Sequence, residues 1–99
     1  MIVYGRAIEL MQQSMSGLYR AGLLKEDPTV SDDTVLLGTG STLDSIAFVT
    51  FVTDLEDRLS RETNQDIALV LSAIHEFNPA ESALRANALA RYVVQLTGG

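Results

Sequence analysis

The chain has 99 residues, enough for a single domain over residues 1–99, and 46% of them are hydrophobic, which excludes a disordered tail. Seven basic and thirteen acidic residues give a net charge of −6, so the chain lacks the basic stripe that nucleic-acid binding requires. It has no cysteine, and no stretch approaches the roughly 20 consecutive apolar residues of a membrane span, which argues against disulfides, zinc knuckles and membrane insertion. Residues 1–5 show no basic region before an apolar run, so we expect no signal peptide and a cytoplasmic protein.

The first predicted element is an amphipathic helix over residues 2–20. Its apolar positions recur at intervals of three and four residues: Tyr4, Ile8, Met11, Met15 and Leu18. This periodicity is lost over residues 21–43, where glycine, proline and the run 31–33 favour turns. So long a loop is usually functional or mobile, and we expect Val35–Leu37 to anchor it to the core.

Three more helices are predicted after this loop. The second begins at Asp44-Ser45 and ends near Arg61-Glu62, and the third covers residues 67–77, although its short apolar start, 67–71, also fits an extended segment. The run Asn78-Pro79-Ala80-Glu81 predicts the start of the last helix, which closes at Gly98-Gly99. The expected fold is therefore all-α: a small four-helix bundle without strands and with a long loop between its first two helices.

The sequence over residues 37–46 is the most informative about function. It reads Leu-Gly-Thr-Gly-Ser-Thr-Leu-Asp-Ser-Ile and places Asp44 and Ser45 at the start of the second predicted helix. Taken as isolated residues, Asp44 or Ser45 would be explained as a helix cap that satisfies free backbone N–H groups. A Leu-Gly pair, several small or polar residues, then Leu-Asp-Ser-Ile and a helix that ends in an acidic cluster resemble the phosphopantetheine attachment site of acyl carrier proteins. The order of the predicted helices and the closing run 88–93 are similar to that family too, so the resemblance covers essentially the whole chain.

The resemblance implies that Ser45 carries a 4′-phosphopantetheine arm, attached from coenzyme A by a phosphopantetheinyl transferase, whose thiol holds acyl groups as thioesters. It also implies that Asp44 supports the Mg²⁺ of the transferase, besides capping the helix. A phosphodiester on Ser45 would meet free N–H groups and the positive end of the helix dipole, and we expect Gly38 and Gly40 to let the loop approach the serine. Such a protein is not an enzyme; as a monomer it would present acyl groups to the loading and accepting enzymes of fatty-acid, other lipid or secondary-metabolite biosynthesis.

The second helix is the partner face that the resemblance implies. The expected partner-binding residues are Ile46, Phe48, Asp54, Glu56 and Asp57. Because Phe48 and Val49 cannot both point inward, we expect one exposed apolar side chain near Ser45, either as a docking patch or as the edge of a wider core stripe. Carrier proteins commonly have acids in the first two turns after the serine, and their absence here favours a specialised stand-alone carrier.

Other functions remain as alternatives or are disfavoured. A peptidyl or aminoacyl carrier would use the same serine, and an unmodified acidic helical adaptor that binds a basic protein is the alternative from another class. His75, the only histidine, has no evident second ligand for a metal site. A Ser-His-Asp hydrolase is disfavoured because the glycines of a nucleophile elbow are missing.

Overall fold

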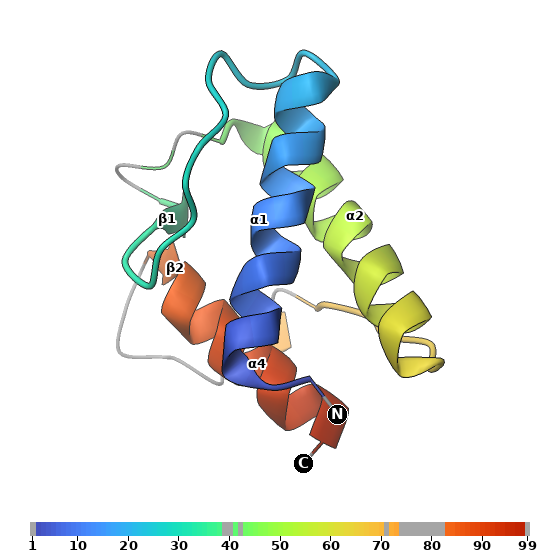
Figure 1. The fold of residues 1–99 in the computed structure, drawn as a ribbon. Helices are drawn as coiled ribbons and strands as arrows, with labels where there is room; N and C mark the ends of the chain where they lie inside the picture. Colours follow the sequence, from blue (N-terminus) through green and yellow to red (C-terminus); the bar gives the residue numbers. More distant parts are fainter. Residues whose placement is uncertain (1, 39–40, 42, 71, 74–82, 99) are drawn as a thin grey trace.

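The computed structural model describes residues 2–38, 41, 43–70, 72–73 and 83–98 (Figure 1). This part of the chain is mostly helical, with three helices and a small two-stranded sheet. In chain order the elements are α1 (Tyr4–Arg20), β1 (Val35–Leu37), α2 (Ser45–Thr63), β2 (Leu84–Arg85) and α4 (Ala86–Gly98). Helix α1 packs against both α2 and α4, and the radius of gyration of 12.4 Å is close to the roughly 13 Å expected for a compact chain of this length. None of the helices in the described ranges combines the length and the apolar character needed to cross a membrane.

The first two predicted helices are confirmed. Helix α1 begins at Tyr4 rather than at the predicted Ile2, because the backbone N–H of Ile2 donates to Thr97 Oγ1 of α4 at 3.1 Å and residues 2–3 stay outside the helix. Helix α2 extends to Thr63 and ends at Asn64, which adopts a left-handed conformation with φ of 54°. The core is lined from α1 by Ala7, Leu10, Met11, Ser14, Met15 and Leu18, and from α2 by Ala47, Phe48, Phe51, Leu55 and Leu59.

The expectation of a strand-free fold is wrong, because β1 pairs antiparallel with β2, with Val35 opposite Arg85 and Leu37 opposite Leu84. Of the three β1 residues only Leu36 is fully buried, so among the three it is the one that anchors the loop, and Val30 of the same loop is also buried in the core. Strand β2 occupies positions that were predicted to be helical, and α4 starts only at Ala86. The pairing joins segments almost fifty residues apart, so neither strand has a local signal long enough to be recognised in the sequence.

The long loop between α1 and α2 holds the start of α4. The backbone N–H of Ala86 donates to Thr34 O at 2.8 Å, and that of Asn87 donates to Asp32 O at 3.0 Å. Backbone carbonyls of the loop thus satisfy donors that the first turn of a helix leaves free. The predicted start of the last helix at Asn78 lies outside the described residues.

Residues 66–70, which follow α2, form no helix, and this corrects the helix predicted to begin at Ile67; their alternating burial favours the extended alternative. Burial alternates along it: Ile67 and Leu69 are buried, whereas Ala68 and Val70 are exposed. Because successive side chains of an extended chain point to opposite sides, this alternation lets two of them enter the core. Farther along that predicted helix Ser72 and Ala73 are helical, as predicted, and residues 71 and 74–77 lie outside the described residues.

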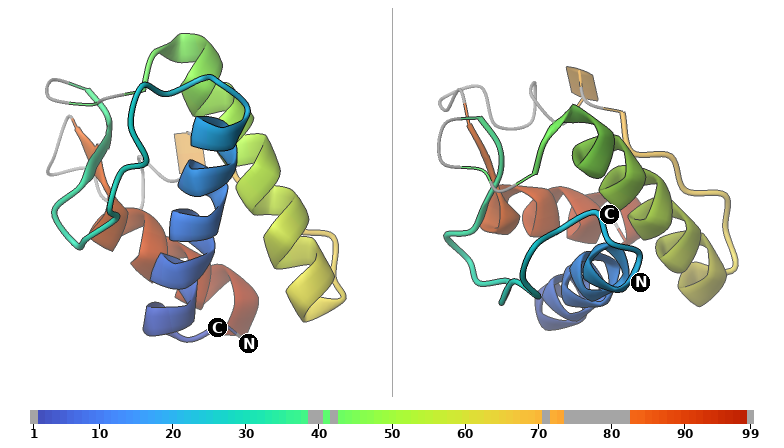
Figure 2. Two further views of the ribbon diagram at one scale, coloured as in Figure 1. Left: turned by 45° about the horizontal axis from the view of Figure 1, so that its top comes forward. Right: turned by 90° about the horizontal axis from the view of Figure 1, so that it is seen from above.

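The two ends of the chain lie close together at one end of the molecule, as Figures 1 and 2 show. The start of α2 and the loop that follows α1 lie at the opposite end (Figure 2). This arrangement separates the predicted attachment residue from both termini.

Candidate functional site

Ser45, the predicted modified residue, is the first residue of α2, and its side chain is exposed. The helix starts there because Asp44 caps it, as predicted: Asp44 Oδ1 accepts a hydrogen bond from the backbone N–H of Ala47 at 2.7 Å. The carbonyl of Asp44 accepts the N–H of Phe48 at 2.8 Å, and its backbone is extended, with φ of −81°. The cap therefore fixes the residue at which α2 begins and places Ser45 in its first turn.

The environment of Ser45 is suited to an anion. Ser45 Oγ and the backbone N–H groups of Ser45 and Ile46 have no hydrogen-bond partner among the residues that the structure describes. No acidic residue lies in the first turn of α2, and one carboxylate oxygen of Asp44 is already engaged by Ala47. Free N–H groups at the positive end of a helix stabilise a covalently attached phosphate group.

The turn before Asp44 is organised by Ser41. Its hydroxyl donates to Leu36 O at 2.8 Å and accepts the N–H of Leu43 at 3.1 Å. Gly38, expected to allow an approach to the serine, instead lies against Ala83: at φ of 111°, an added Cβ would come within 3.1 Å of Ala83 Cα. Gly38 therefore permits contact between the loop and the segment that leads into β2, and Gly40 lies outside the described residues.

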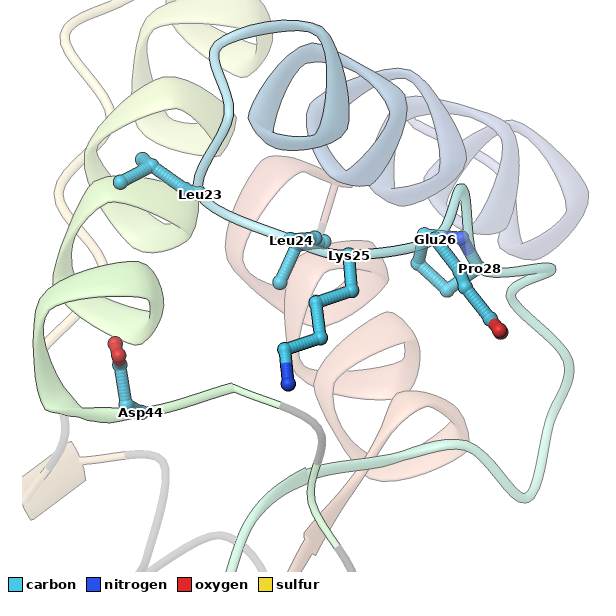
Figure 3. Close-up of a pocket in the computed structure, with 6 residues that line it drawn as sticks. All are labelled: Leu23, Leu24, Lys25, Glu26, Pro28 and Asp44. Carbon is cyan, nitrogen blue, oxygen red and sulfur yellow. The ribbon is translucent and has the colours of Figure 1, made fainter.

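A cleft of about 520 Å³ adjoins the start of α2 (Figure 3). Its lining consists of Leu23, Leu24, Lys25, Glu26, Pro28 and Asp44. Residues 23–28 were not predicted to form a site; the one signal they carry is an apolar Leu-Leu pair in a stretch without helical periodicity. The cleft exists because the loop after α1 passes beside the α2 cap, a relation that the local sequence does not contain.

The outer face of α2 carries the expected exposed apolar side chain near Ser45. Val49 is 62% exposed and Ile46 is 70% exposed, whereas Phe48 is only 3% exposed and packs in the core. Phe48 was expected to bind partners; its burial corrects that expectation, because almost none of its surface is accessible. Farther along this face an open hollow of about 530 Å³ is lined by Val49, Thr50, Thr53, Asp54 and Asp57.

The three predicted acids of α2 have different surroundings. Asp54 forms an ion pair with Arg58 at 2.6 Å, and Asp57 forms one with Arg61 at 3.2 Å. Asp54 and Asp57 both line the open hollow on the outer face. The Asp57–Arg61 pair is exposed and contributes little stability, whereas Arg58 of the other pair is half-buried and also donates to Gln13 Oε1 of α1 at 3.1 Å.

Glu56 has a structural contact instead. Its Oε2 accepts the backbone N–H of Leu69 at 2.7 Å, and Ser60 Oγ accepts that of Ile67 at 2.9 Å. These two side chains hold the extended segment against α2. Glu56 is half-buried, and its carboxylate is less available to a partner than those of Asp54 and Asp57.

No cluster of three or more potential metal-ligating side chains occurs within the described ranges, and His75 lies outside them. The structure thus brings together an exposed serine, a capping aspartate, a cleft and an aliphatic patch at one end of α2. In comparisons with protein-family models, with curated proteins and with solved structures, no match to this chain was found.

Proposed function

We propose that this protein is an acyl carrier protein whose Ser45 is the attachment point of 4′-phosphopantetheine. The observation that carries the proposal is the exposed Ser45 at the first position of α2, immediately after the capping Asp44. It is supported by the local sequence and by the free N–H groups beside the hydroxyl. Within the proposed four-helix bundle, α1, α2 and α4 are the first, second and last helices.

The chemistry of attachment requires an accessible hydroxyl. Ser45 Oγ forms a bond to the phosphorus of the phosphopantetheinyl group, the pyrophosphate bond of coenzyme A breaks, and adenosine 3′,5′-bisphosphate leaves. The hydroxyl proton passes to a base of the transferase, and Asp44 would support the Mg²⁺ of the transferase. When bound, the arm supplies a thiol that holds acyl groups as thioesters, a group that this cysteine-free chain lacks.

The proposed partner face is the exposed side of α2. Ile46 and Val49 supply apolar contact next to Ser45, and Asp54 and Asp57 supply carboxylates farther along for Arg or Lys of a client enzyme. The order along the helix, aliphatic first and acidic second, supports a specialised carrier with its own acyl-loading and acyl-accepting enzymes.

The test is the intact mass of the protein after incubation with coenzyme A and a broad-specificity phosphopantetheinyl transferase. We expect a gain of one phosphopantetheinyl group, which Ser45→Ala abolishes. Ser41→Ala is the matched control, because it removes the other serine of the 37–46 segment and leaves the gain intact. An unmodified wild-type chain would overturn the proposal and favour the adaptor alternative.

A peptidyl or aminoacyl carrier would give the same mass gain. The cargo distinguishes the two: protein isolated from its native host with the thioester intact should carry a fatty or polyketide acyl group. An aminoacyl group on the arm would instead establish the peptidyl-carrier alternative.

A further inference from the structure

We propose that the cleft lined by residues 23–26, Pro28 and Asp44 receives the arm attached to Ser45, with Lys25 paired to its phosphodiester. This inference rests on the proposed function and adds a binding site to it. The cleft volume of about 520 Å³ falls within the roughly 300–1,000 Å³ of small-molecule sites, and its walls combine apolar side chains with a few polar ones, as such sites do.

The position of the cleft suits a tethered occupant. Asp44, which forms one wall, directly precedes Ser45, so an arm on Ser45 is attached one residue from that wall. A tethered group has a high effective concentration at a neighbouring site, so modest contacts are enough to hold it there.

Lys25 provides the charge that a phosphodiester requires. Within the described part of the chain its amine has neither an ion-pair nor a hydrogen-bond partner. Figure 3 shows its side chain entering the space between the loop and Asp44, whereas the carboxylate of Glu26 points away from it. A lysine in a chain of net charge −6 that pairs with no carboxylate is available to bind an anion as a point charge.

The loop wall of the cleft is held in place by α1. The amide of Gln12 bridges two loop residues, donating to Pro28 O and accepting the N–H of Val30, both at 2.7 Å. Ser16 Oγ donates to Asp27 Oδ1 at 2.8 Å. Because these bonds fix residues 27–30 before anything binds, less ordering entropy is lost in that part of the loop when the arm enters.

The apolar lining determines which part of the arm it contacts. Leu23, Leu24 and Pro28 form an aliphatic surface beside Lys25, and Leu24 also packs against the main core. With the phosphodiester at Lys25, the branched aliphatic segment that follows it in pantetheine would lie on this surface. The thiol end remains free to reach client enzymes.

The inference is tested by NMR on protein whose modification has first been confirmed by intact mass. We expect nuclear Overhauser contacts between the geminal methyl groups of the arm and the side chains of Leu24 and Pro28. We also expect amide shifts over residues 23–27 relative to unmodified Ser45→Ala. Lys25→Gln should reduce these contacts and shifts several-fold and Lys25→Arg should retain them, while Arg91→Gln, which removes an exposed cation of α4, should leave them unchanged.

The outcomes separate this inference from the proposed function. Full modification without contacts or shifts at residues 23–28 overturns the cleft and leaves the carrier proposal standing. Contacts that persist unchanged in Lys25→Gln overturn the role of Lys25. Failure of Ser45 to accept the arm overturns the proposed function and the cleft together.

Discussion

Asp44 has a structural and a chemical role that substitution can separate. Its carboxylate caps α2 through the 2.7 Å bond from Ala47 N–H, and the proposed function adds support of Mg²⁺ during modification. Asp44→Ala removes both roles. Asp44→Asn keeps an oxygen that can accept the same hydrogen bond but removes the negative charge.

The stability effect follows from the cap. Replacement of an N-cap residue by alanine costs about 1 kcal/mol, within a range of about 0.5–2 kcal/mol, and Asn is nearly as good a cap as Asp. The charge of Asp44 adds about 0.3–1 kcal/mol through the helix dipole, toward the lower end because the side chain is exposed. We expect Asp44→Ala to lower the free energy of unfolding by about 1 kcal/mol, or Tm by roughly 4–8 °C, and Asp44→Asn to lower it by less than half as much.

Two assays distinguish the roles. Urea unfolding followed by circular dichroism measures the cap, and the rate of mass gain with coenzyme A and transferase measures modification. We expect both variants to be modified more slowly than wild type, although only Asp44→Ala is clearly destabilised. Equal destabilisation by Asn and Ala would refute the cap argument; a wild-type modification rate in Asp44→Asn would refute the Mg²⁺ role.

Three further predictions concern stability. Ser14 is fully buried, and its Oγ has no hydrogen-bond partner among the described residues. Ser14→Ala should therefore raise the free energy of unfolding by about 1 kcal/mol in urea titrations. A lower free energy of unfolding would contradict the assignment of Ser14 Oγ as unpaired. The backbone of Asn64 has the left-handed conformation, which alanine adopts at a cost and glycine adopts freely. Asn64→Ala should therefore lower the free energy of unfolding by about 1 kcal/mol, and Asn64→Gly should not. Equal effects of the two substitutions in urea titrations would contradict this explanation. The hydrogen bond from Arg6 lowers the pKa of Glu62 below 4.5, so the stability from this pair is complete above that pH and is lost as the pH falls through the lowered pKa. Wild type should therefore have a higher Tm than Glu62→Gln at pH 7, and the difference should shrink toward pH 3; a constant difference would contradict this assignment.

Helices α1 and α2 could be predicted because their signals are local. Apolar residues at intervals of three and four mark the buried stripes, and Asp44 marks a helix start through a bond to a residue three positions away. The candidate site shares this advantage, since the exposure of Ser45 follows from its place directly after the cap.

The errors arise where contacts distant in the chain decide the conformation. Periodicity placed Ile67 in a helix, yet side chains of α2 bind the backbone of residues 67–69 and hold it extended. Phe48 is buried and Val49 is exposed because of the face that α2 turns toward α1. The apolar pattern of the sequence allowed either of the two side chains to point into the core.

The sequence by itself determined the acidic, cysteine-free composition, two of the helices and the position of Ser45 directly after a helix cap. Only the tertiary structure decided what surrounds that serine. The cleft needs the loop after α1 to pass beside Asp44, and that path is set by Gln12 and Ser16 of α1. The physical reason is distance along the chain: a cap is formed by neighbours that any local pattern contains, whereas a cleft is formed by segments that meet only when the whole chain has folded.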